Sequence, residues 1–217
     1  HSAGPNSIAG TLATTNTALT LNSATAVTTN SSIAAGSGTV TLGAATLSDG
    51  VTLTLGTGDS GAITATSFTG TASGSASNVT FNVTGAVTVS GAIGTDIGTL
   101  TVTNSGGATF SGAVGASGAG NSVASIVLTA TTGTVAFNDD LYATGITNTG
   151  GTFNLNLFGT TTSVTNSVTF GTSGTVAFGN GSDTLTFTGG LVHSAGPNSI
   201  AGTLATTNTA LTLNSAT

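Results

Sequence analysis

Residues 88–94 read TVSGAIG, and residues 109–115, which lie 21 positions further on, read TFSGAVG. A second pair of copies, both reading GTVAF, occupies residues 133–137 and 174–178 and is separated by 41 positions. The larger shift is about twice the smaller one, as expected for one and two turns of the same coil. In such a coil each turn buries its apolar side only by stacking on neighbouring turns. The two shifts therefore predict a solenoid with turns of about 20 residues.

Short alternations of apolar and small polar residues run through the chain and predict β-strands with one buried and one exposed face. The clearest examples are residues 19–21, 40–42, 51–55, 79–83, 87–89, 100–102, 108–110, 135–137, 153–157, 168–170, 176–178 and 185–187. Clusters of Gly, Asn, Asp and Ser between them predict tight corners with positive φ angles. These clusters include Asp49-Gly50, Ser105-Gly106-Gly107 and Gly179-Asn180-Gly181.

A much longer repeat joins the two ends of the sequence. Residues 1–25 read HSAGPNSIAGTLATTNTALTLNSAT, and residues 193–217 read the same 25 letters without a substitution. This recurrence predicts a tandem array with a period of 192 residues. Residues 1–192 are then one period of a continuous β-solenoid, and residues 193–217 start the next identical period. With strands stacked about 4.8 Å apart, a period of roughly nine or ten turns would extend on the order of 45 Å along the axis.

These patterns predict an all-β fold, namely a parallel β-helix (β-solenoid). The alternative is a tandem pair of immunoglobulin-like β-sandwiches, because 192 residues would divide into two domains of the usual size. Sandwich cores usually contain a large aromatic residue, whereas this chain has no Trp and a single Tyr, Tyr142. The halves of the period also show no evident similarity, while the 21- and 41-residue shifts are visible. The solenoid is therefore the favoured prediction.

The composition excludes several classes of function. The chain has no Lys, Arg or Cys and six acidic residues, all Asp, which give a formal net charge of −6. Without a cationic side chain there is no basic patch to neutralise phosphates, so we expect no nucleic-acid partner. The hydrophobic fraction of 37% argues against disorder. No apolar run approaches the roughly 20 residues of a transmembrane helix, so we expect a chain that is not membrane-spanning.

Three blocks of the chain resemble a known class of repeats. Residues 85–94 (GAVTVSGAIG), 108–118 (ATFSGAVGASG) and 174–187 (GTVAFGNGSDTLTF) are similar to the β-strand repeats of large bacterial secreted adhesins and autotransporter passenger domains. The similarity spans most of the period and lies in composition. It implies a right-handed parallel β-helix, export to the cell surface, and a role in adhesion or in a surface layer or fibre. No catalytic residue is implied by it.

Three aspartates are weak candidates for calcium binding. Residues 179–185, which include Asp183, match most of a glycine- and aspartate-rich nonapeptide that binds Ca²⁺ between turns of a β-roll. The motif occurs once, whereas such sites form from consecutive copies, so a Gly-rich corner is the favoured interpretation. Asp139 and Asp140 are adjacent carboxylates without a cationic partner, which suits either a metal-ligand pair or a solvated turn, and we favour the turn. No other cofactor and no other metal ligand is predicted.

Residues capable of catalysis occur without the partners that catalysis needs. His193 is alone in its period, with no Cys or Glu and no Asp nearby in sequence, so we expect a surface or corner histidine. The many Ser and Thr residues lack a base and an orienting group, so no nucleophile is predicted and the chain is not expected to be an enzyme. The threonine pairs Thr52/Thr54 and Thr101/Thr103 are similar to those of ice-binding solenoids. They show no common turn spacing, and the strand preference of Thr explains them.

The function that these features favour is structural. We expect a repeat of an extracellular filament, sheath or surface layer, built by end-to-end stacking of identical 192-residue units. The partners are then adjacent periods and neighbouring chains, and the location is the cell surface or the secreted material. The alternative is the stalk of a bacterial adhesin that mediates attachment or biofilm formation, with a cell-surface or glycan ligand of unknown identity.

Overall fold

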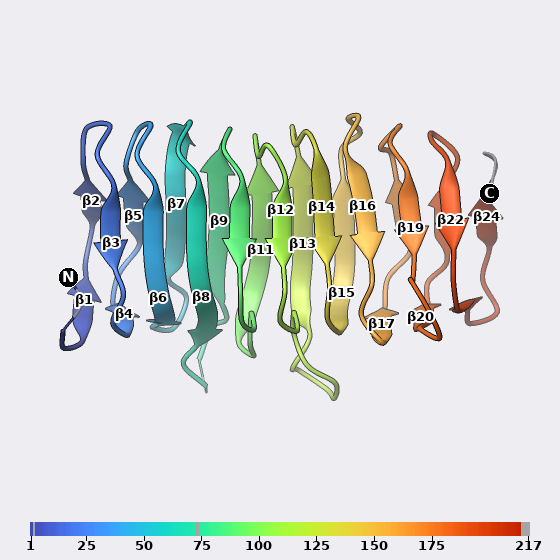
Figure 1. Cartoon of the computed structure of the whole chain (residues 1–217). Coiled ribbons are helices and arrows are strands. Elements are labelled where there is room, and N and C mark those ends of the chain that lie inside the picture. Colours follow the sequence, from blue (N-terminus) through green and yellow to red (C-terminus); the bar gives the residue numbers. More distant parts are fainter. Residues whose placement is uncertain (2, 73, 214–217) are drawn as a thin grey trace.

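Alternating side chains and glycine-rich corners fold the chain into a β-solenoid of about ten turns, with roughly 21 residues per turn. The computed structural model describes residues 1, 3–72 and 74–213. The turns stack from the N-terminal end at the left of Figure 1 to the C-terminal end at the right. Pairing between the described strands is parallel, whereas immunoglobulin-like sandwiches are antiparallel. The predicted parallel β-helix is confirmed, and the sandwich alternative is wrong.

Each turn passes through three stacks of strands, here named faces 1, 2 and 3 in the order in which the chain visits them. Face 1 contains β1 (Asn6–Ile8), β4 (Thr25–Val27), β17 (Thr161–Val164), β20 (Thr184–Phe187) and β23 (Thr203–Thr206). Face 2 contains β2 (Thr11–Ala13), β5 (Ser31–Ala34), β7 (Thr52–Asp59), β9 (Ser77–Val83), β11 (Ile97–Thr103), β13 (Val123–Thr129), β18 (Val168–Phe170), β21 (Leu191–His193) and β24 (Leu211–Leu213). Face 3 contains β3 (Leu19–Leu21), β10 (Val87–Val89), β12 (Ala108–Phe110), β14 (Thr134–Phe137), β16 (Asn154–Leu157), β19 (Val176–Phe178) and β22 (Asn198–Ile200).

Three longer strands run through a corner and so belong to two faces. They are β6 (Val40–Leu47) and β8 (Ile63–Gly70), which join faces 3 and 1, and β15 (Leu141–Asn148), which joins faces 1 and 2. Between β8 and β15, face 1 narrows to the single bridging residues Ile93 and Val114. On face 2, the second half of β15 lies next to β18 of the following turn. In Figure 1, face 3 lies at the front, face 2 behind it and face 1 along the lower edge.

The strand register confirms both short repeats. Val87 pairs with Ala108, 21 residues on, which is one turn. Val135 pairs with Leu155, which in turn pairs with Val176, so the 41-residue shift is two turns. Turns are longer where the loops after β8 and before β13 extend beyond the stack (Figure 1).

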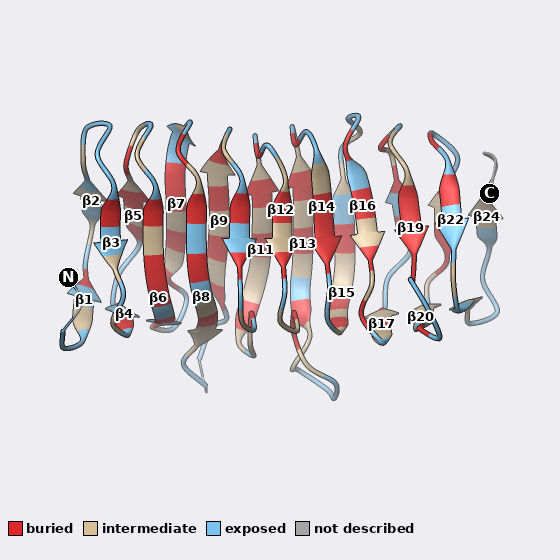
Figure 2. Ribbon diagram, in the orientation of Figure 1, coloured by how far each residue is buried: buried red, intermediate tan, exposed pale blue. Residues whose placement is uncertain are grey.

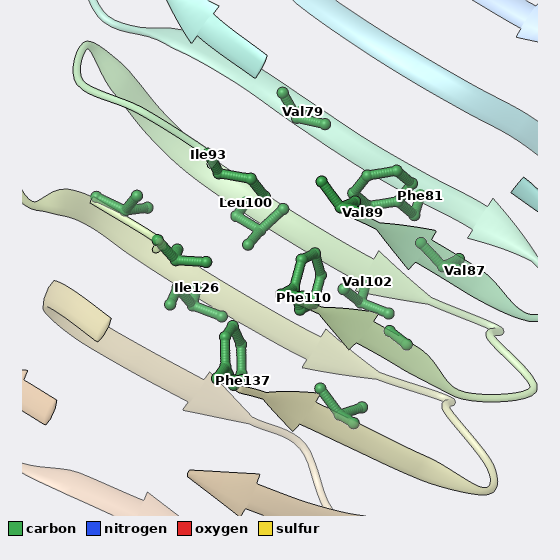
Figure 3. Packing of buried hydrophobic residues seen from close by; sticks show 14 of the residues in the cluster. Val79, Phe81, Val87, Val89, Ile93, Leu100, Val102, Phe110, Ile126 and Phe137 are labelled. Atoms are coloured by element: carbon green, nitrogen blue, oxygen red, sulfur yellow. The ribbon is translucent and has the colours of Figure 1, made fainter. Parts of the chain in front are cut away.

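The core is a continuous column of apolar side chains inside the coil. Along most strands alternate residues point inward, and Figure 2 shows this alternation as red bands of buried residues. Phe110 and Phe137 pair in register on consecutive turns, and their rings stack with centroids 5.0 Å apart (Figure 3). Such in-register contacts between neighbouring turns replace the cross-sheet packing of a sandwich.

Glycines at the corner before face 3 allow the turns to approach closely. A Cβ atom on Gly61 would lie 1.9 Å from the carbonyl oxygen of Gly38, and one on Gly85 would lie 2.5 Å from that of Gly61. These glycines are required for space, because any side chain would meet the backbone of the turn below. Other corners need the left-handed conformation, as predicted from sequence, and Gly50 (φ 67°) and Gly179 (φ 81°) are examples.

Candidate functional site

Asp139 and Asp140 lie at the corner between β14 and β15, where their carboxylates accept backbone hydrogen bonds. The N–H of Thr161, in the following turn, donates to Asp140 Oδ1 at 2.8 Å, and the Tyr142 hydroxyl donates to Oδ2 at 3.4 Å. The Asp140 N–H donates to Asp139 Oδ1 at 2.8 Å. Asp140 therefore links two turns at a corner. Asn154 makes a similar link, because its side-chain oxygen accepts a hydrogen bond from the backbone N–H of Thr175 in the next turn.

Asp183 lies two turns further along the same corner. It is buried, and its Oδ2 accepts a hydrogen bond from the N–H of Asn180 at 2.8 Å. The turn between Asp140 and Asp183 contributes Gly159 and Thr160, neither of which carries a carboxylate. Two turns correspond to about 10 Å, whereas calcium ligands lie about 2.3–2.6 Å from the ion. Asp140 and Asp183 are thus too far apart to share one ion.

Among the described residues, no group of three or more His, Cys, Asp or Glu side chains is placed to hold a metal ion. The weak calcium candidates Asp139 and Asp183 accept hydrogen bonds within their own corners, and Asp140 accepts one from the next turn. Calcium binding at any of them rests on the sequence pattern alone.

The expectation of a surface or corner histidine is wrong for His193. This residue lies in β21 with its side chain pointing into the core, and it is completely buried. Nδ1 is 2.7 Å from the Asn198 side-chain oxygen, and Nε2 is 3.0 Å from the Thr172 carbonyl oxygen. Its ring also packs edge-on against Phe170. Both ring nitrogens are thus engaged in the interior, which makes this histidine a packing element between turns.

Threonines recur at the turn spacing on the outer surface, contrary to the expectation from sequence. Thr54, Thr80 and Thr101 pair in register on three consecutive turns of face 2. A second ladder on face 3 follows five consecutive turns and consists of Thr20, Thr41, Thr64, Thr88 and Thr109. The ladders were not visible in the sequence because loops lengthen some turns and not others, so the paired threonines are not evenly spaced along the chain.

The last described turn exposes apolar residues that are covered elsewhere in the same chain. Leu211 is 44% exposed and Ile200 is 41% exposed, whereas their copies Leu19 and Ile8 are buried beneath the following turn. The side-chain nitrogen of Asn198 is buried and has no hydrogen-bond partner among residues 1, 3–72 and 74–213. We call the turn formed by β22, β23 and β24 the second copy of the repeated segment.

The copy of Asn198 in the first period shows what satisfies such a side chain. The Asn6 nitrogen donates to the Ser23 carbonyl oxygen and lies within hydrogen-bond distance of Thr25 Oγ1, both at 3.2 Å, in the turn that follows. A following turn therefore supplies partners for the polar group and cover for the apolar groups of this segment.

Comparisons of the chain with protein-family models, with curated proteins and with solved structures found no match. The described residues form no pocket that could enclose a small molecule. Within the same residues, no helix has the length and apolar character needed to cross a membrane.

Proposed function

We propose that this chain is a structural repeat of an extracellular filament, sheath or surface layer, in which 192-residue units follow one another in one continuous coil. The observation that carries the proposal is the repeated segment. The strands β22, β23 and β24 of its second copy repeat the sequence of β1, β2 and β3, and those first-copy strands pair with the next turn of the coil.

The pattern of hydrogen bonds suits a filament. Backbone bonds link each turn to the next along the axis, on three faces, so a further turn adds the same bonds without a new type of contact.

The composition suits a durable material outside the cell. Trypsin-like proteases cut after Lys or Arg, and the chain has neither residue. It also lacks Cys, Met and Trp, so few side chains are readily oxidised. These features support an extracellular location, which antibody labelling of intact source cells would test directly.

Electron microscopy and fibre diffraction of the native material test the proposal. A thin, uniform rod with a reflection near 4.8 Å along its axis is the expected result. A string of separated globules, or an antigen found only inside cells, would contradict it. A uniform rod that ends in a distinct globular tip would favour the adhesin stalk over the sheath or layer.

A further inference from the structure

The two copies of the 25-residue segment lie on different faces of the solenoid. The strand β1 lies on face 1, but its copy β22 pairs with β19 on face 3. The strand β2 lies on face 2, but its copy β23 pairs with β20 on face 1. The strand β3 lies on face 3, but its copy β24 pairs with β21 on face 2. All three copies are therefore displaced by one face in the same direction.

The displacement follows from the number of strand positions in one period. From β1 to β22 the chain makes 26 moves from one face to the next, counting both halves of β6, β8 and β15 and the bridging residues Ile93 and Val114. Nine complete turns would need 27 moves. The period is therefore one move short of nine turns, and at about 4.8 Å per turn it advances about 42 Å.

Two corners of the segment keep their local conformation on the new faces. Asn16 and its copy Asn208 both adopt the left-handed conformation, with φ angles of 53° and 54°. Gly10 and Gly202 have φ angles of 102° and 115°. The hydroxyl of Thr14 donates to the Thr17 carbonyl oxygen, and the hydroxyl of Thr206 donates to the Thr209 carbonyl oxygen in the same way. Gly4, in contrast, has a φ angle of 85°, whereas its copy Gly196 does not have a positive φ angle. The corners at Gly10 and Asn16 therefore keep their geometry on a new face, and the corner at Gly4 does not.

We infer that successive periods are rotated by one third of a turn about the solenoid axis. This inference rests on the proposed continuous array and specifies how one period joins the next. The second copy shows how the segment sits on the preceding turn, through His193 and the carbonyl oxygen of Thr172, and the first copy shows how the next turn covers it, through Asn6 and Thr25. A given outward residue then returns to the same side of the rod only after three periods, about 125 Å along the axis.

The consequence for recognition is a surface with three equivalent sides. A threonine ladder that occupies one side in one period moves to the next side in the following period. Neighbouring rods can therefore meet the same ladder from any of three directions, with an axial offset of about 42 Å between sides.

A labelled chain of three consecutive periods, ending with residues 193–217, tests the rotation. The chain has no cysteine, so Thr88→Cys introduced in each period gives one reactive site per period. Thr88 is exposed at the centre of face 3, where it tolerates a bulky label. Biotin attached at these sites, followed by monovalent streptavidin and electron microscopy, shows the direction in which each label projects.

A single-period chain calibrates the angles. Thr88→Cys and Thr147→Cys place labels at exposed positions on faces 3 and 2 of the same molecule and give the angle between adjacent faces. A continuous rod whose three labels project to three sides, about 42 Å apart along the axis, is the expected result. A continuous rod with all labels in one row would overturn the rotation and leave the filament proposal intact. Separated globules would overturn the continuous array and therefore also the rotation between periods.

Discussion

His193 and His1 are the same residue of the repeat in two environments within one chain. His193 is buried and bonded at both ring nitrogens, whereas the His1 side chain is exposed. We expect His193→Ala to lower the stability by about 2–4 kcal/mol, because it leaves a cavity and two unpaired polar groups. Thermal unfolding measures the effect. The matched variant His1→Ala should unfold at the same temperature as the wild-type protein. Equal decreases in melting temperature for both variants would refute the structural role of the buried His193.

Some glycines lie against the backbone of a neighbouring turn, whereas others lie at corners with open space around them. Substituting one glycine of each kind by Ala distinguishes their roles. A Cβ on Gly61 would meet a backbone oxygen at 1.9 Å, whereas one on Gly181 would meet no atom within 4 Å. We expect Gly61→Ala to lower stability by about 1–3 kcal/mol through forced separation of two turns, and Gly181→Ala to have little effect. The comparison uses melting temperatures and circular dichroism. Similar melting temperatures would show that the turns can separate at no cost.

At the scale of the strand and its corners, side-chain hydrogen bonds fasten one turn to the next. Asp140→Ala removes the acceptor for the Thr161 N–H and should cost about 1 kcal/mol, whereas Asp140→Asn keeps an acceptor and should cost less. Asp139→Ala is the local control, because Asp139 is exposed and bonds only within its own corner. Melting curves with and without CaCl₂ give a second result. If Asp140 ligated calcium, Asp140→Asn would abolish a calcium-dependent rise in melting temperature.

Regular strands were predictable from sequence because their inward positions are all apolar. The strands at residues 87–89, 108–110 and 176–178 begin and end where the alternation does. The strands β4, β5 and β17 were missed because Thr25, Ser31 and Thr162 occupy inward positions and break the pattern. Once the neighbouring turns supply the apolar contacts, a small polar residue can be buried there.

The contacts of His193 and the threonine ladders could not be predicted from the sequence. The repeat predicted that each turn stacks on a similar turn, but the burial of His193 depends on Asn198 and on Thr172 in the preceding turn. The threonine ladders depend on loop lengths, since the step from Thr54 to Thr80 is longer than that from Thr80 to Thr101. Such relations appear only when the strand register is known.

At the scale of the whole molecule, the turn formed by β22, β23 and β24 should make the isolated chain of residues 1–217 associate with itself. Leu211 is exposed there, while its copy Leu19 is buried beneath the next turn. We expect Leu211→Thr to weaken concentration-dependent association in sedimentation experiments and to leave the melting temperature nearly unchanged. The matched variant Leu19→Thr should lower stability by about 2–3 kcal/mol, because it places a hydroxyl in the core. Association that is insensitive to Leu211→Thr would show that the molecules meet elsewhere.

The stacking of turns along one axis also determines how the coil responds to tension. A pull along the axis loads the outermost turn first, because each turn is held mainly by the turns on either side of it. A turn of roughly 21 residues occupies about 4.8 Å of the rod, but it spans about 70 Å when its chain is drawn out straight. Each turn that detaches lengthens the fibre more than tenfold locally and leaves the next turn intact. The solenoid would therefore dissipate a sudden load by uncoiling one turn at a time.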